Sequence, residues 1–225
     1  METTRRDFLG AIAANAAMLG AMPLSFDLMA TAAHAAPPQG EKWDVSWTSK
    51  VNGKHKAIFD VPEVDSGYGV WRAGMWEPQY HATQGAKPAE TATVLVLRHN
   101  ALVLGFNQEF WDKYDIGNHD KVTHPITQQS TTSNPVLLSS AKNEVPAQFD
   151  AFALPNFLAK GGIVLACNVA LQFFSAGLAQ QAGISEDEAR KLATAALLPG
   201  VKLQPSGVFA CVLAQEAGCR YVRAS

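Results

Sequence analysis

The sequence contains few charged residues of either sign. Of its 225 residues, 18 are lysine or arginine and 20 are aspartate or glutamate, so its formal net charge is only −2. A nearly neutral chain offers no basic surface for phosphates, which argues against nucleic acid and anionic membranes as partners. No apolar run after residue 35 reaches the roughly 20 residues of a membrane-spanning helix. We therefore expect no nucleic-acid partner and no stable membrane insertion once residues 1–35 are removed.

The chain also lacks the short motifs that mark common cofactor sites. It has no phosphate-binding loop, dinucleotide fingerprint, serine-nucleophile elbow or internal repeat. His119, Asp120 and His124 are metal-ligating residue types, but they lie in a polar segment without an established zinc-site spacing. We therefore favour a solvated loop for these three residues and predict neither a metal nor another cofactor.

Cysteine is rare as well, with only Cys167, Cys211 and Cys219 present. An odd number of cysteines cannot pair completely within one chain, so at least one is free, modified or intermolecularly bonded. Cys211 and Cys219 are close in sequence and are the more suitable structural pair. Two buried, unpaired thiols are an equally good interpretation of these two residues.

The N-terminus carries a twin-arginine export pattern. Arg5 and Arg6 stand before an apolar pair, an alanine-rich run follows, and residues 33–35 form an Ala-His-Ala cleavage site. The alternative is an amphipathic or membrane-anchoring segment, which Pro23 and Asp27 disfavour because they interrupt the apolar run. The sequence therefore predicts a signal peptide over residues 1–35 and a periplasmic location.

Apolar strand patterns alternate with helical patterns along the rest of the chain. We expect a tether over residues 36–52 and one α/β domain over residues 53–225, with a long polar insertion at about 107–146. Strands separated by helices indicate a mostly parallel sheet with helices on both faces. The main predicted strands are residues 55–61, 93–98, 163–166 and 219–223.

Three local expectations are specific enough to be tested. Pro78 should kink or end the helix that contains it. Residues 101–106 are apolar and are either a short strand or a loop under the sheet. Ser206 should cap a helix, whose buried face we expect to be formed by Val208, Phe209, Val212 and Leu213.

The polar residues at the strand ends form the candidate site. In an open parallel sheet, ligands bind in the crevice beyond the carboxyl ends of the strands. We expect that crevice to gather Asp60, His99, Asn100, Cys167, Asn168, Ser206 and Gly207.

Cys167 is the principal chemical candidate in this group, because it follows a buried strand and Asn168 opens a helix. The positive end of that helix favours thiolate over thiol. His99 is the candidate proton partner or counter-cation, and the backbone N–H groups of Ser206 and Gly207 are candidates for holding an anion. Each residue also has a simpler interpretation: Cys167 as a small buried thiol, His99 as a histidine bonded to the backbone, and Ser206 as a helix cap.

Three segments of the C-terminal half resemble the DsrE/DsrF-like family of sulfur-relay proteins. They are Lys-Gly-Gly to Ala-Cys-Asn at 160–168, Leu-Pro-Gly-Val to Pro-Ser-Gly-Val at 198–208, and Gln-Glu-Ala-Gly-Cys-Arg-Tyr-Val at 215–222. The resemblance implies a three-layer α/β/α sandwich with about five strands, assembled as a homo-oligomer. It also implies that Cys167, at the matching position, carries sulfur as a persulfide.

These observations predict a periplasmic sulfur-handling protein, either a persulfide carrier or a sulfurtransferase-like enzyme. Cys167 and His99 are its predicted reactive residues, and a sulfur donor or acceptor protein is its predicted partner. The alternatives are a non-catalytic, homo-oligomeric module that binds a ligand or protein in the same crevice, and a structural oligomer.

Overall fold

Five parallel strands form the centre of the protein. The computed structural model describes residues 42–225, so the predicted signal peptide with Arg5 and Arg6, and the start of the predicted tether, lie outside the described residues. The strand order is β4-β3-β2-β1-β5, and all four neighbouring pairs are parallel. The strands are β1 (His55–Val61), β2 (Thr91–Leu97), β3 (Ile163–Cys167), β4 (Lys202–Gln204) and β5 (Arg220–Arg223).

The three inner strands consist mainly of aliphatic residues because helices cover both of their faces. β3 is buried at every position, and β1 and β2 at nearly all. Continuous apolar strands of this kind are typical of parallel sheets. The predicted α/β class and mostly parallel sheet are therefore confirmed, and the sheet has five strands.

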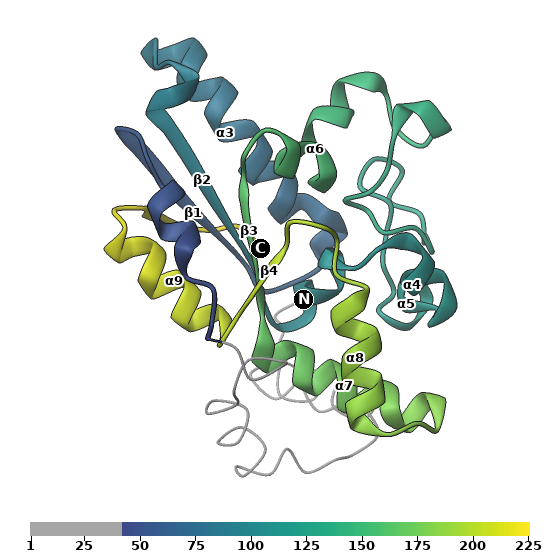
Figure 1. Ribbon diagram of the computed structural model, residues 1–225. Coiled ribbons are helices and arrows are strands. Elements are labelled where there is room, and N and C mark those ends of the chain that lie inside the picture. Colours follow the sequence, from purple (N-terminus) through teal and green to yellow (C-terminus); the bar gives the residue numbers. More distant parts are fainter. Residues whose placement is uncertain (1–41) are drawn as a thin grey trace, which may run out of the picture.

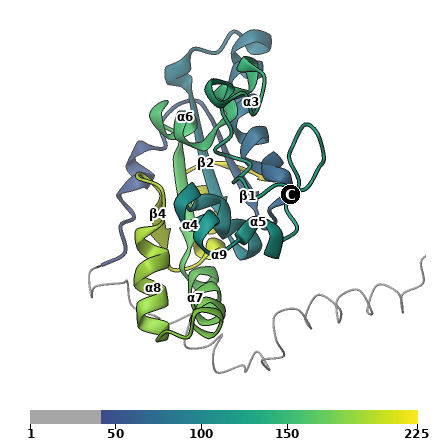
Figure 2. The same ribbon diagram turned by 90° about the vertical axis from the view of Figure 1, so that its right-hand side faces the viewer.

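The helices make two unequal outer layers (Figures 1 and 2). One apolar core joins the first face of the sheet to residues of α3, α4, α6, α7 and α8. The second core joins the other face to α9 and Trp47. The result is a three-layer α/β/α sandwich. The helices are α3 (Tyr68–Gln84), α4 (Gln108–Lys113), α5 (Ile116–His119), α6 (Leu154–Ala159), α7 (Asn168–Ala182), α8 (Glu186–Ala195) and α9 (Gly207–Glu216).

Helix α7 begins directly at the end of β3 and lies beside α8 beyond that edge of the sheet (Figure 1). It ends at Gly183, whose φ of 66° is the left-handed conformation that glycine adopts readily. Ser206 caps α9 through its hydroxyl oxygen, as the sequence predicts, and Ser185 caps α8 in the same way. None of the helices within residues 42–225 is long and apolar enough to cross a membrane.

The buried face predicted for α9 is wrong for three of its four residues, and only Leu213 packs partly buried against the core. Val208 and Val212 are 66% and 50% exposed, and Phe209 is exposed as well. The buried residues are Gly207, Ala210, Cys211 and Ala214. This helix is apolar on nearly every side, so hydrophobicity does not decide its orientation. The small residues face the sheet because they allow the helix axis to approach it closely.

Three other segments differ from, or sharpen, the sequence expectations. Pro78 does not end α3, which continues to Gln84. Residues 99–105 form a 3-10 helix, buried from Ala101 to Gly105, rather than a strand or loop. The segment 107–146 is packed into the domain, with Trp111 and Asn134 both fully buried.

The described part of the tether is attached to the domain by Trp47. This side chain is fully buried in the core beneath α9, within the short 3-10 helix Ser46–Lys50. Its indole Nε1 donates a hydrogen bond to Oε1 of the buried Gln204, at 3.1 Å. Trp47 therefore belongs to the apolar core that packs on the sheet, and the segment around it is not a free linker.

Candidate functional site

An ion pair lies at the carboxyl ends of β1 and β2. Arg98 donates two hydrogen bonds to Asp60, from Nε to Oδ1 at 2.7 Å and from Nη2 to Oδ2 at 2.9 Å. Tyr221 on the edge strand β5 donates a third, from its hydroxyl to Oδ2 at 2.6 Å. The parallel register explains this meeting, because Asp60 lies next to β5 while Arg98 is the first residue after β2.

The charge on Asp60 is stabilised despite burial. Burial raises the cost of ionising this carboxyl, but the hydrogen bonds from Arg98 and Tyr221 outweigh that cost, so its pKa lies below the usual value. The carboxylate is 2% exposed. Because its acceptor positions are occupied by these donors, Asp60 is suited to holding the site together rather than to taking up a proton.

Gly207 brings the first turn of α9 onto this ion pair. A Cβ atom at this position would lie 2.5 Å from Cβ of Arg98, so only glycine allows so close a contact. The adjacent Ser206 hydroxyl accepts a hydrogen bond from the Phe209 backbone N–H at 3.0 Å. The structure thus brings Gly207 against Arg98, and the adjacent Ser206 is engaged as a helix cap.

All three cysteines are buried and unpaired. Burial, together with the charge of Asp60, raises the pKa of the Cys211 thiol to about 12, and the Cys167 thiol contributes to that rise. Burial likewise raises the pKa of Cys219 to about 11. Cys211 and Cys219 are therefore neutral thiols at physiological pH and poor nucleophiles.

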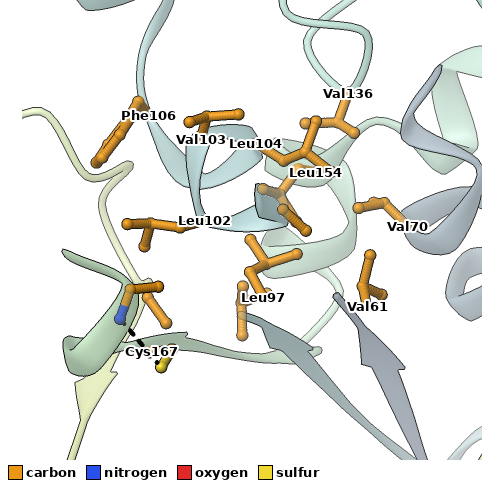
Figure 3. Close-up of a cluster of buried hydrophobic side chains, with 14 of the residues drawn as sticks. Val61, Val70, Leu97, Leu102, Val103, Leu104, Phe106, Val136, Leu154 and Cys167 are labelled. Carbon is orange, nitrogen blue, oxygen red and sulfur yellow. Dashed lines mark hydrogen bonds between the residues drawn. The ribbon is translucent and has the colours of Figure 1, made fainter. Parts of the chain in front are cut away.

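Cys167 lies at the junction of β3 and α7. Its Sγ accepts a hydrogen bond from the backbone N–H of Ala170 at 3.4 Å, so the thiol is the side-chain cap of α7 (Figure 3). Figure 3 places it at the margin of the main apolar core. Cys167 is the last residue of β3, so its position at the strand end is as predicted. Its side chain has little access to solvent, because the residue is only 6% exposed.

His99 and Asn100 lie at the same edge of the sheet but point to another partner. His99 Nδ1 is 3.3 Å from Oε1 of Glu63, and Asn100 Nδ2 donates to Oε2 of the same carboxylate at 2.8 Å. The His99 side chain is 64% exposed and makes no hydrogen bond to Cys167 within the described chain. A direct proton partnership of His99 with Cys167 is therefore absent in this conformation.

Asn168 has a partner that sequence analysis did not find. Nη2 of Arg190, on α8, donates to Asn168 Oδ1 at 2.5 Å. Asn168 is fully buried, and its Nδ2 has no hydrogen-bond partner among residues 42–225. The buried Nη1 of Arg190 has no partner among these residues either. Burial lowers the pKa of Arg190, and the nearby Asp187 opposes that shift.

The histidines of the segment 107–146 do not converge on a common centre. His119 contacts the adjacent Asp120, whereas His124 Nε2 lies 3.1 Å from the carbonyl oxygen of Glu144. His124 Nδ1 accepts from backbone N–H groups in its own turn. Among residues 42–225, no group of three or more His, Cys, Asp or Glu residues could hold a metal ion.

Three residues of the site were missed by sequence reasoning: Arg98, Arg190 and Tyr221. Arg98 had a usable signal, since it directly follows a buried strand, as Asn168 does. Tyr221 and Arg190 had none, because their contacts depend on β5 pairing with β1 and on α8 folding back along α7.

Comparisons with protein-family models, with curated proteins and with solved structures find no match to this chain. The resemblance to sulfur-relay proteins therefore remains a prediction from the sequence motifs, and the function must be inferred from the site itself.

Proposed function

We propose that this protein handles sulfane sulfur in the periplasm, with Cys167 as the residue that carries it. The observation that supports this is the position of its sulfur, which accepts the Ala170 N–H at the first turn of α7. A helix N-terminus favours negative charge, and the thiolate is the form that attacks sulfur. The high pKa values of Cys211 and Cys219 leave Cys167 as the candidate carrier.

The proposed step is an exchange of one sulfur atom. The Cys167 thiolate attacks the outer sulfur of a donor persulfide, R–S–SH. A new S–S bond forms on Cys167, the S–S bond of the donor breaks, and the donor leaves as the thiolate R–S⁻. No external oxidant is required. Because Cys167 is 6% exposed, the exchange needs a local opening near the first turn of α7.

The direct test is uptake of sulfur from cysteine persulfide by the purified protein, followed by mass spectrometry. We expect one sulfur per chain in the wild type and in the Cys211→Ser and Cys219→Ser variants, and none in Cys167→Ser. Equal uptake by Cys167→Ser, or no uptake by the wild type, would contradict the proposal.

A homo-oligomeric binding module is the second candidate, and a different observation favours it. Among residues 42–225, five of the eight exposed large hydrophobic side chains lie on α9 and the strand that follows it. We define the α9–β5 face by four of these residues: Val208, Phe209, Val212 and Tyr221. Val222 pairs with Phe59 and therefore points to the other side of the sheet. Clustered exposed apolar residues are typical of protein–protein contacts, and β5 is also an edge strand with an open side.

A further inference from the structure

We propose that Asn168 and Arg190, at the N-terminus of α7, form a binding site for a small oxyanion of the sulfate, thiosulfate or phosphate type. The site adjoins Cys167 but does not depend on sulfur carriage, since its contacts come from other atoms. It goes beyond the proposed function by assigning a ligand class to a part of the molecule that the cysteine chemistry does not use.

The evidence is a pair of donors without acceptors. Nδ2 of Asn168 and Nη1 of Arg190 are buried and have no hydrogen-bond partner in the described part of the chain, although the two side chains touch through Nη2 and Oδ1. Asn168 is fully buried. Buried polar groups in folded proteins nearly always have partners, so two unmet donors on adjacent side chains indicate a missing acceptor.

The contact between the two side chains fixes which atoms are available. Oδ1 of Asn168 accepts from the guanidinium, so the amide nitrogen necessarily remains as the unmet group. Turning the amide over would instead place its NH₂ group against the NH₂ of Arg190, donor against donor. Both available groups are therefore donors, and one of them belongs to a cation.

The surroundings favour an anion over a neutral acceptor. Asn168 is the first residue of α7, a helix of 15 residues, so the positive end of the helix dipole adds to the charge of Arg190. Asp187, in the first turn of α8, is the acidic residue whose charge acts on Arg190. Asp187 is solvent-exposed, so water screens it more strongly than it screens the buried donors.

The size of the ligand follows from burial. Both unmet nitrogen atoms are shut off from solvent, so the proposed ligand is a small ion rather than a larger molecule. Arg190 as a residue is only partly buried, and movement of its long side chain is the expected route of entry. An ion with several oxygen atoms then accepts from the guanidinium and the amide together.

The test is titration of the full chain with sodium sulfate and with sodium thiosulfate, at constant ionic strength against sodium chloride. Calorimetry measures binding, and NMR follows the side-chain amide of Asn168. We expect saturable binding that shifts this amide signal and is weakened about tenfold or more in Arg190→Gln. Arg220→Gln, which removes an exposed arginine on β5, is the matched control and is expected to bind as the wild type does.

Absence of saturable binding to the wild type, or equal binding by Arg190→Gln, would overturn the proposal and leave a buried water as the acceptor. The amide signal in the wild type keeps the test decisive if Arg190→Gln fails to fold. Repeating the titration on Cys167→Ser separates the two proposals, because the anion should still bind where sulfur uptake is lost.

Discussion

The buried carboxylate of Asp60, on β1, is hydrogen-bonded to residues of two other elements that are far from it in the sequence. It receives hydrogen bonds from Arg98 after β2 and from Tyr221 on β5. Removing its charge leaves Arg98 without a counter-ion, which is costly because the pair is largely withdrawn from water. This residue is therefore the one whose substitution should most affect the strand-end site.

We predict that Asp60→Asn lowers the free energy of unfolding by about 2–3 kcal/mol, less than for a fully buried pair because Arg98 reaches solvent. Urea unfolding measures this loss. Tyr221→Phe, which removes one hydrogen bond and keeps the ion pair, is the graded control, with an expected loss of about 1–2 kcal/mol. Equal stability of Asp60→Asn and the wild type would contradict this role.

The same residue predicts a dependence of stability on pH. The folded-state pKa of Asp60 is lowered, so its contribution is present above its unfolded pKa of about 3.9 and is lost as pH falls through the folded value. Unfolding measured from pH 6 down to acid should therefore show a steeper loss of stability in the wild type than in Asp60→Asn. Parallel curves would argue against the shift.

At the residue scale, the sequence predicts which polar residues lie at the strand ends but not the contacts that they make. The apolar run Ile-Val-Leu-Ala-Cys predicts that Cys167 lies at the end of a buried strand. Its burial depends on how its neighbours close over the strand end, which no local pattern records. For the same reason, the pairing of His99 and Asn100 with Glu63 was not foreseen.

At the scale of elements, α9 shows that residue size as well as polarity orients a helix. Its existence and its Ser206 cap followed from the sequence. Its buried face could not be predicted, because both sides of the helix are apolar: valine and phenylalanine lie on one side, and glycine, alanine and cysteine on the other. Close packing against the sheet selected the smaller residues, since burying larger side chains would push the helix outward.

Gly207→Ala tests this close approach. The new methyl group would meet Arg98 at 2.5 Å, so we expect a loss of about 1–3 kcal/mol in the free energy of unfolding. Gly177→Ala is the matched control, because nothing lies within 4 Å of a Cβ atom there. This change within the exposed face of α7 should stabilise the protein by about 0.5–1 kcal/mol. Similar losses in both variants would contradict the packing argument.

At the scale of the whole molecule, the two outer layers are unequal. Many elements cover one face of the sheet, including the segment 107–146, whereas α9 and the Trp47 segment cover the other. The alternation of strands and helices predicted the parallel sheet. The packing of the segment 107–146 was not predictable, because its buried residues, among them Trp111 and Asn134, follow no helical or strand period.

No described residue among 42–225 covers the α9–β5 face, and we predict that copies of this chain associate through it. Val212→Lys should shift the molar mass measured by light scattering to that of a monomer, because the lysine charge cannot be buried in an apolar contact. Folding should be unaffected, since Val212 is half exposed. Ile126→Lys, at an isolated exposed residue, is the control. A wild type that is monomeric at all concentrations would refute this interface.

The central proposal is that Cys167 carries sulfur, and its most direct test is the intact mass of the protein isolated from the cells that produce it, before and after treatment with reductant. We predict an added mass of one sulfur atom, about 32 Da, that reductant removes and that is absent from Cys167→Ser. An unmodified wild type, or the same added mass in Cys167→Ser, would contradict the account.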